Sequence, residues 1–234
     1  MTKPAPLATA PFETPGHDLL KGKKVVVTAA AGTGIGYASA HRALLEGADV
    51  LVSDWHERRL RETQEKLAAE FPGQAVEALT CDVSSTEQVD ALIAGAADAL
   101  GRIDVLVNNA GLGGETPLVD MTDEEWDRVL DITLNGTFRA TRAALRYFKG
   151  VEHNGVLVNN ASVLGWRAQH SQAHYAAAKA GVMASLGAAR SRPPNTGSGS
   201  TPSHRPSRGT PSSPRSPARN SSTNWHPTSL RPRR

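Results

Sequence analysis

The feature of this sequence that most constrains its fold is a regular alternation between two kinds of segment. From Lys24 to Asn160, short β-branched apolar runs alternate with longer amphipathic stretches, as is typical of a parallel sheet joined by crossover helices. The predicted strands are Val25–Thr28, Val50–Ser53, Val76–Thr80, Val105–Val107 and Val156–Val158. The predicted helical segments are Ile35–Glu46, Glu57–Ala69, Thr86–Leu100 and Thr122–Phe148. Because such crossovers are right-handed, we expect an α/β fold with a doubly wound parallel sheet and ligands at the carboxyl ends of its strands.

Charge and composition divide the chain near residue 184. The 50 residues that follow hold 9 of the 26 basic residues, all of them Arg, and none of the 23 acidic residues. The first 184 residues therefore carry −6 and the tail +9. Half of the tail is Ser, Pro and Gly, a composition that cannot form a core. We expect an N-terminal extension at 1–20, one folded domain at 21–184 and a disordered tail at 185–234.

Cysteine content and hydropathy bear on where the protein works. The single cysteine, Cys81, cannot form an internal disulfide and offers no metal cluster, which suits a reducing compartment. The first 24 residues contain no apolar signal segment, and no run of about 18 apolar residues occurs in the chain. We therefore expect a cytoplasmic protein with no membrane span and no metal site.

A glycine-rich turn follows the first predicted strand. Gly32, Gly34, Ile35 and Gly36 lie where the strand gives way to a helix. Glycines at such a turn let the backbone approach a pyrophosphate, and the helix N-terminus offers it free N–H groups and a positive dipole end. The position after the first strand favours a dinucleotide site in a Rossmann-type sheet. The alternative is an ordinary tight turn between strand and helix.

An acidic residue closes the second predicted strand. Asp54 lies about 20 residues beyond the glycine turn, where a carboxylate accepts hydrogen bonds from the adenosine ribose. Its negative charge repels a 2′-phosphate, so NAD is favoured over NADP as the cofactor. Arg58 and Arg59 follow closely and either soften that preference or form part of a solvated helix surface.

Two further strand ends carry residues that suit the same crevice. Asp82 and Val83 follow the third strand, and Asn109, Ala110 and Gly111 follow the fourth. Each group alone is typical of a loop with local side-chain-to-backbone bonding. Together they are expected to line one cofactor cleft.

The most specific constellation comprises Ser162, Tyr175 and Lys179. A spacing of four places Tyr175 and Lys179 on one helix face, where an ammonium group can stabilise a phenolate. Tyr175 then suits a general acid and base, and Ser162 suits a hydrogen-bond donor to the reacting oxygen. The trio predicts proton transfer coupled to hydride transfer at a carbinol carbon. A tyrosine and lysine on an Ala-rich helix are otherwise a packing feature.

These residues resemble the short-chain dehydrogenase/reductase family over roughly residues 20–184. The segments DVLVNNAG at 104–111 and YAAAK at 175–179 carry the resemblance. It implies that Tyr175 is the acid and base, that Lys179 holds the nicotinamide ribose and stabilises the tyrosinate, and that Ser162 orients the substrate. It also implies a set of cofactor contacts: Gly32, Gly34 and Gly36 at the pyrophosphate, Asp54 at the ribose, Asp82 and Val83 at the adenine, and Asn109 at the cofactor backbone.

The sequence departs from the family pattern at three places. Alanines at 29 and 30 replace the usual first glycine, and the turn is one residue longer. Thr133 stands where the family's fourth catalytic residue, an asparagine, usually lies, and Asn135 is two positions away. After Lys179 the family continues with two more strands and a substrate-binding segment, whereas this chain turns into Arg/Ser/Pro sequence. Loss of those strands predicts an unpaired fifth strand, marginal folding and weak or no turnover.

The tail is compatible with a shifted reading frame. With synonymous codons chosen accordingly, Arg190–Thr201 encodes IEAAEYGVRIN in the other frame, which is similar to the family's next helix and strand. Arg219–Ser229 encodes an amphipathic ELLDELASDE segment in the same way. Loss of one C after Met183 accounts for the change. The alternative is a natural disordered tail.

The resemblance extends to a bacterial subgroup that acts on ring hydroxyl or keto groups of bicyclic coenzyme A thioesters from steroid degradation. Residues 159–170 carry it, and Trp166 and Arg167 either shape a pocket for a bulky anionic substrate or form a surface loop. The alternatives are a 3-oxoacyl-thioester reductase and a non-catalytic NAD-binding remnant. Nucleic-acid binding by the tail is disfavoured because aromatic interleaving is absent. The intact family is commonly a homo-oligomer, an arrangement that this chain's ending puts in doubt.

Overall fold

A computed structural model describes residues 14–189, and these residues form a parallel β-sheet covered by helices. The five strands are β1 (Lys24–Thr28), β2 (Asp49–Asp54), β3 (Val76–Thr80), β4 (Val105–Asn108) and β5 (Val156–Asn159). Their order in the sheet is β3-β2-β1-β4-β5, and every neighbouring pair is parallel. The predicted doubly wound α/β fold is confirmed, because the order reverses at β1 and the chain crosses to the other side to form β4.

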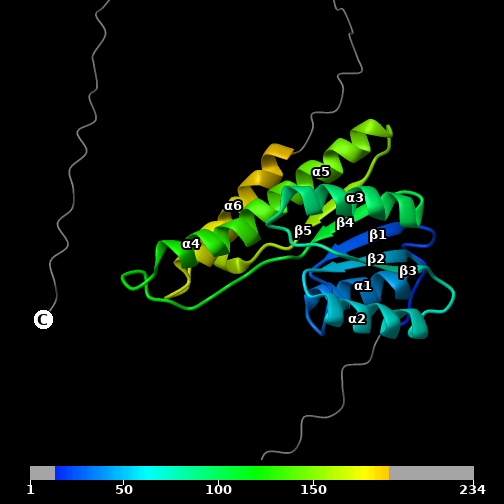
Figure 1. Cartoon of the computed structure of the whole chain (residues 1–234), viewed down its shortest axis with the longest axis horizontal. Helices are drawn as coiled ribbons and strands as arrows, with labels where there is room; N and C mark the ends of the chain where they lie inside the picture. Colours follow the sequence, from blue (N-terminus) through cyan, green and yellow to red (C-terminus); the bar gives the residue numbers. More distant parts are fainter. Residues whose placement is uncertain (1–13, 190–234) are drawn as a thin grey trace, which may run out of the picture. The chain divides into compact units, whose positions relative to one another are not determined.

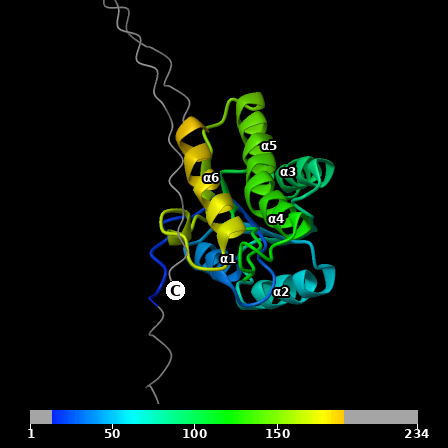
Figure 2. The same ribbon diagram turned by 90° about the vertical axis from the view of Figure 1, so that its left-hand side faces the viewer.

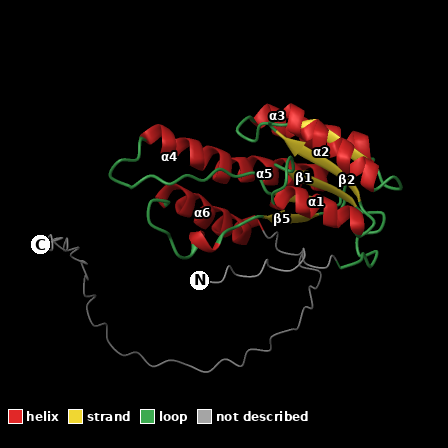
Figure 3. Cartoon of the chain, turned by 90° about the horizontal axis from the view of Figure 1, so that it is seen from below, coloured by secondary structure: helices red, strands yellow, loops and turns green. Residues whose placement is uncertain are grey.

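Helices cover both faces of this sheet (Figure 1). On one face lie α1 (Ile35–Leu45) and α2 (Glu57–Glu70), and on the other lie α3 (Thr86–Leu100), α5 (Gly136–Gly150) and α6 (Ala173–Ala189). Figure 2 shows α3, α5 and α6 in sequence across that second face, with α4 (Asp123–Leu130) continuing the line of α5. Figure 3 shows that α4, the start of α6 and the loops next to them lie beyond one end of the sheet.

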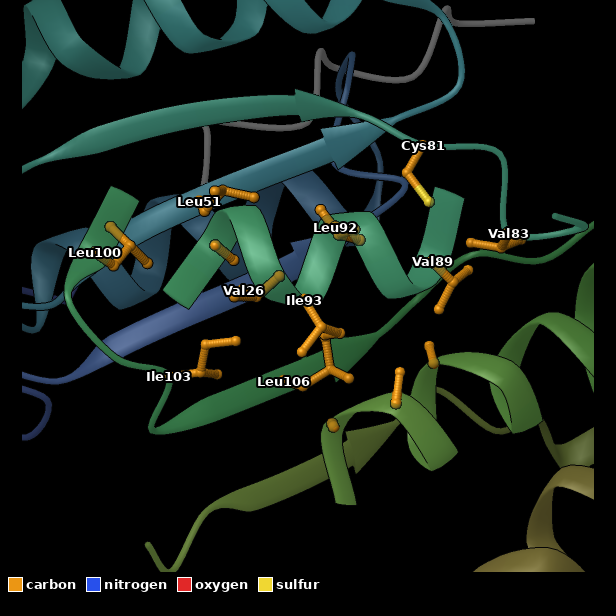
Figure 4. Packing of buried hydrophobic residues seen from close by; sticks show 14 of the residues in the cluster. Val26, Leu51, Cys81, Val83, Val89, Leu92, Ile93, Leu100, Ile103 and Leu106 are labelled. Atoms are coloured by element: carbon orange, nitrogen blue, oxygen red, sulfur yellow. The ribbon is translucent and has the colours of Figure 1, made fainter. Parts of the chain in front are cut away.

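Two hydrophobic clusters, one on each face, fix the position of β1. Val25 and Val27 pack under α1 and α2, whereas Val26 packs under α3 and α5. Figure 4 shows Val26 together with Leu106 of β4 and Leu92 of α3 in the second cluster. A strand buried on both faces has no polar side, which explains why β1 is a continuous β-branched run.

The segment predicted as one helix, Thr122–Phe148, is divided by a π-helical turn at Asp131–Asn135. Its start follows from a capping box, in which the Thr122 side chain accepts from Glu125 N–H and the Glu125 side chain accepts from Thr122 N–H. Thr133 in the π turn is fully buried and faces the loop after β4. The turn therefore lies beside the expected ligand site, as π turns often do.

The buried carboxylate of Asp104 forms hydrogen bonds with several segments at the end of the sheet opposite to the glycine turn. Asp104, just before β4, accepts hydrogen bonds from Lys24 N–H at 2.8 Å, from the Arg102 guanidinium and from His153 Nε2 at 3.0 Å. The Arg102, Lys24 and His153 hydrogen bonds outweigh the effect of burial and lower the pKa of Asp104. This carboxylate thus joins the starts of β1 and β4 to the loop before β5.

A second carboxylate, Glu46 after α1, holds the start of the described chain. It accepts from the backbone N–H groups of His17 and Leu19 at 2.8 and 3.1 Å, and it pairs with Arg42. The backbone hydrogen bonds, with the help of Arg42, lower the pKa of Glu46 to about 2. Residues 17–19 are thereby attached to the end of α1.

Strand β5 forms one edge of the sheet that the structure describes. It pairs with β4 in register, and its Val156 and Val158 side chains are 55% and 46% exposed. Residues 185–189 of the predicted tail belong to helix α6, and the remainder, including the segments read in another frame, lies outside the described residues from residue 190 onward. None of the helices within residues 14–189 has the length and apolar character needed to cross a membrane.

Candidate functional site

The glycine turn lies between β1 and α1, and its backbone is shaped for an anion. Gly32 has φ +93°, a conformation that favours glycine. Helix α1 begins at Ile35, and its N-cap Gly34 provides no side-chain acceptor; the first turn contains no acidic residue. The first N–H groups of α1 are therefore available to an external acceptor such as a phosphate.

Gly36 marks a close approach within this turn. A Cβ at this position would lie 2.3 Å from the Ala29 carbonyl oxygen and 2.6 Å from Asn109 Nδ2. Asn109 Nδ2 donates to the carbonyl oxygens of Thr28 and Ala29 at 3.2 and 3.0 Å. The loop after β4 is thus bonded directly to the glycine turn, as the convergence of parallel strand ends requires.

A cavity of about 460 Å³ opens next to the turn and collects most of the predicted adenosine contacts. Asp54, Asp82, Val83, Ala110 and Gly111 all line it. The Asp54 carboxylate is 7% exposed and accepts from Ala31 N–H at 3.2 Å and His56 N–H at 3.0 Å. Because a carboxylate offers about four acceptor sites, it can still accept two hydroxyl hydrogen bonds from a ribose.

Sequence reasoning missed Trp55, which lines this cavity directly after Asp54. Trp55 and Arg59 line it near Asp54, whereas Arg58 pairs with Glu62 on the surface of α2. Cys81 also lines it, and burial, assisted by the charge of Asp82, raises the pKa of the Cys81 thiol to about 11. The position of Trp55 directly after Asp54 was the available signal, since a residue at a strand end faces the same crevice.

A second cavity, of about 490 Å³, contains the predicted acid–base pair. Tyr175 and Lys179 line it together with Gly34 and Ile35 of the glycine turn and with Asn109. Gly111 belongs to both cavities. The structure therefore brings the Tyr/Lys pair of α6 to the same crevice as the turn and the adenosine cavity.

Lys179 is held in place by burial and one hydrogen bond. It is 3% exposed, its Nζ donates to the carbonyl oxygen of Asn160, and Nζ lies 5.6 Å from the centroid of the Tyr175 ring. Removal from water lowers the pKa of Lys179. The ammonium group thus lies above the ring of Tyr175 with two N–H donors to spare.

Ser162 lies near the cavity of Tyr175 and Lys179 but does not line it. It is the N-cap of a short 3₁₀ turn, Val163–Gly165, and its Oγ accepts from Leu164 N–H at 3.2 Å. It lines a separate cavity of about 490 Å³ with Ala161, Val163, Trp166 and Met183. The turn packs against α6 near Lys179, since a Cβ at Gly165 would lie 2.8 Å from the Lys179 carbonyl carbon.

The chain is similar to known proteins over most of its length. The sequence profile described as "short chain dehydrogenase" matches residues 23–191. The chain belongs to the short chain dehydrogenase family. A relative from Mycobacterium tuberculosis, named (5R,7aS)-5-hydroxy-7a-methyl-1-oxo-2,3,5,6,7,7a-hexahydro-1H-indene-carboxyl-CoA reductase, is 70% identical over 178 residues, which cover 76% of this chain and 68% of that protein. The chain spans about two thirds of the length of the curated relatives it matches.

Solved structures of other family members agree with the fold. A short chain dehydrogenase from Mycobacterium smegmatis matches with a TM-score of 0.73 and 72% identity, covering 75% of this chain and 73% of that one. A short chain dehydrogenase/reductase from Burkholderia phymatum, solved in complex with NAD, matches with a TM-score of 0.68 and 31% identity over 72% of this chain and 59% of that one. The residues at the crevice of this short chain dehydrogenase fit a nicotinamide dinucleotide: uncapped N–H groups, a carboxylate at the end of β2 and two cavities that share Gly111.

The short chain dehydrogenase site places Thr133, and not Asn135, beside the crevice. Thr133 Oγ1 accepts from Leu112 N–H at 2.9 Å and donates to Leu112 O at 3.0 Å. Asn135 Nδ2 instead donates to Asp131 Oδ1 at 3.1 Å and stays exposed. A Cβ at Gly111 would lie 3.6 Å from both Lys179 Nζ and Thr133 Oγ1. Thr133 therefore fixes the loop that passes next to Lys179.

The two residues considered for a bulky substrate, Trp166 and Arg167, are both exposed. Trp166 is 84% exposed, and its indole N–H is directed to Met183 Sδ. No group of three His, Cys, Asp or Glu side chains suited to a metal ion occurs within residues 14–189.

Proposed function

We propose that this protein is an oxidoreductase that transfers a hydride between NAD(H) and a secondary alcohol or ketone on a bicyclic, steroid-derived acyl-CoA. The observation that carries this proposal is the presence of Tyr175 and Lys179 in one cavity with the glycine turn. The substrate class is supported by the 70% identical reductase, whose printed name describes a hydroindene-carboxyl-CoA.

The side chains of the site suit proton transfer to a ketone oxygen. NADH, when bound, supplies the hydride for the carbonyl carbon. Tyr175 is half-buried in the cavity and donates its hydroxyl proton to the oxygen as the carbonyl becomes an alcohol. Lys179, over the Tyr175 ring, stabilises the negative charge left on the phenolate and has donors available for a ribose hydroxyl. Ser162 is proposed to orient the substrate oxygen.

The cofactor preference is proposed to be NAD over NADP. Asp54 is buried at the end of β2, and its carboxylate would face the adenosine ribose. A 2′-phosphate at that place would meet the negative charge, whereas two ribose hydroxyls would donate to it. Arg59 lines the same cavity, and its positive charge would partly offset the repulsion between Asp54 and a 2′-phosphate.

The proposal is tested by following NADH absorbance with the hydroindene-carboxyl-CoA ketone as the substrate. We expect slow oxidation of NADH by the wild-type chain, because its tail replaces the family's last strands and substrate-binding segment. We expect a further loss of at least about a hundredfold in Tyr175→Phe, because general acid catalysis contributes about 10²–10⁴-fold. A 3-oxoacyl thioester serves as the competing substrate. Faster turnover of that thioester would favour the 3-oxoacyl-thioester reductase, and NADH binding without turnover of either substrate would favour the non-catalytic remnant.

Residues 21–184 are proposed to be the NAD-binding domain and residues 185–234 the product of a shifted reading frame. Sequencing the gene across codons 180–190 tests this directly. An additional C after the Met183 codon would restore the family pattern, and its absence would leave the tail as a natural segment. The protein is proposed to work in the cytoplasm. Analytical ultracentrifugation would measure whether this chain forms the homo-oligomer that is common in the intact family.

A further inference from the structure

We infer that Asn160 is a positioning residue that joins the pyrophosphate turn to the lysine of the acid–base pair and so sets the affinity for the nicotinamide half of the cofactor. The inference rests on the proposed binding of NAD(H). Asn160 directly follows β5 and lines the cavity that contains Tyr175 and Lys179. None of the motifs derived from the sequence includes it as a site residue.

The side chain of Asn160 forms a hydrogen bond with the side chain of Asn109, whose orientation is fixed by its own hydrogen bonds. Asn109 Nδ2 donates to two carbonyl oxygens of the turn, those of Thr28 and Ala29. Carbonyl oxygens only accept, so the amide of Asn109 cannot rotate without losing both hydrogen bonds. Asn109 Oδ1 must therefore face away from the turn, and Asn160 Nδ2 donates to it at 2.9 Å.

The backbone of Asn160 meets the other half of the site. Its carbonyl oxygen accepts from Lys179 Nζ, and its N–H donates to Asn108 O at 2.8 Å. One residue thus bonds through its side chain to the loop under the glycine turn and through its carbonyl to the buried lysine. The chain of contacts runs from the Ala29 carbonyl through Asn109 and Asn160 to Lys179.

This link has a specific consequence for cofactor binding. If the turn and Lys179 are held at a fixed separation before binding, the dinucleotide does not have to order them, and affinity rises. Asn160 does not line the adenosine cavity. Its removal is therefore expected to weaken binding of a ligand that spans both cavities and to spare a ligand that fills only the cavity at Asp54.

The experiment compares NADH with adenosine as ligands of Asn160→Leu and Asn160→Asp. Leucine branches at Cγ as asparagine does but is larger and has no donor, and aspartate keeps the shape of asparagine but offers Asn109 Oδ1 only acceptors. The matched control is Asn159→Leu, because Asn159 ends the same strand and accepts from Asn108 Nδ2 at 2.8 Å without a hydrogen bond to the turn. NADH binding is measured by its fluorescence, adenosine binding by NMR titration, and folding by circular dichroism.

We expect both Asn160 variants to bind NADH about tenfold more weakly, with adenosine affinity unchanged, and we expect Asn159→Leu to bind NADH within twofold of the wild type. Equal losses for NADH and adenosine, or an equal selective loss in Asn159→Leu, would overturn the inference, as would failure of both Asn160 variants to fold. Wild-type protein that binds adenosine but not NADH would instead refute the proposed function and remove the inference with it.

Discussion

Replacing Thr133 with valine is the sharpest test of how the site is supported. Valine has the shape of threonine, but it removes the hydroxyl that accepts from Leu112 N–H at 2.9 Å and donates to Leu112 O at 3.0 Å. Thr133 is 0% exposed and Leu112 is half-buried, so both Leu112 backbone groups lose their partner in a partly buried loop. Each unsatisfied group costs about 1–3 kcal/mol, and we expect a total loss of about 2–4 kcal/mol.

Urea unfolding, followed by circular dichroism, measures this loss in the absence of cofactor. Thr133→Ser keeps the hydroxyl and loses only a buried methyl group, so we expect it to cost about 1 kcal/mol. Thr137→Val removes one hydrogen bond within the helix, from Thr137 Oγ1 to Thr133 O at 2.8 Å, and serves as a second control at about 1 kcal/mol. If Thr133→Val is no less stable than these two variants, the hydroxyl does not hold the loop and the argument is wrong.

The remaining predictions concern the turn and two buried acids. Ala29 has φ +50°, so Ala29→Gly should raise the free energy of unfolding by about 0.5–1 kcal/mol, measured in urea. Gly36→Ala should lower it by about 1–3 kcal/mol, because a Cβ meets the Ala29 oxygen. Gly34→Ala has no atom within 4 Å of a Cβ and should cost no more than about 1 kcal/mol, because alanine is a weaker N-cap than glycine. The hydrogen bonds of Glu46 lower its pKa to about 2, so the contribution of this carboxylate to stability is complete above its ordinary pKa of 4.5 and is lost as the pH falls toward 2. In Glu46→Gln the urea midpoint should therefore depend less on pH over that range. An unchanged dependence of the midpoint on pH would count against the pairing. With a pKa of about 11, Cys81 should react with a thiol reagent at pH 8 roughly a hundredfold more slowly in the folded than in the unfolded protein, and equal rates would contradict its burial.

The central strands β1 and β2 were predictable because parallel strands buried on both faces are encoded locally. Val25, Val26 and Val27 form one continuous β-branched run, and the predicted and observed bounds differ by one residue at Lys24. The π turn was not predictable from helical periodicity. In it, Thr133 forms hydrogen bonds with Leu112, which lies 21 positions away in the sequence and meets it only after folding.

The same distinction applies to the site. Asp54 and Asn109 were found because parallel strands bring their carboxyl ends to one edge, so a polar residue at a strand end has a predictable location. Asn160 also follows a strand, but its importance depends on which way the Asn109 amide points, 51 positions away. The left-handed backbone conformation of Ala29 was not predicted, because an alanine in the sequence does not indicate a positive φ.

The central place of β1 has a consequence for the order in which the protein is made. Val25 pairs with Val50 on one side and with Val105 on the other, so the second partner leaves the ribosome about 80 residues after the first strand. At about 5–20 residues per second, that interval is roughly 4–16 s. During this time the edge of β1 that later pairs with β4 presents unpaired backbone groups, and α3, which packs against Val26 on one face of the sheet, is still being synthesised or has just emerged. A strand that is paired on both sides in the finished domain therefore spends several seconds as an open edge that a nascent-chain chaperone can bind.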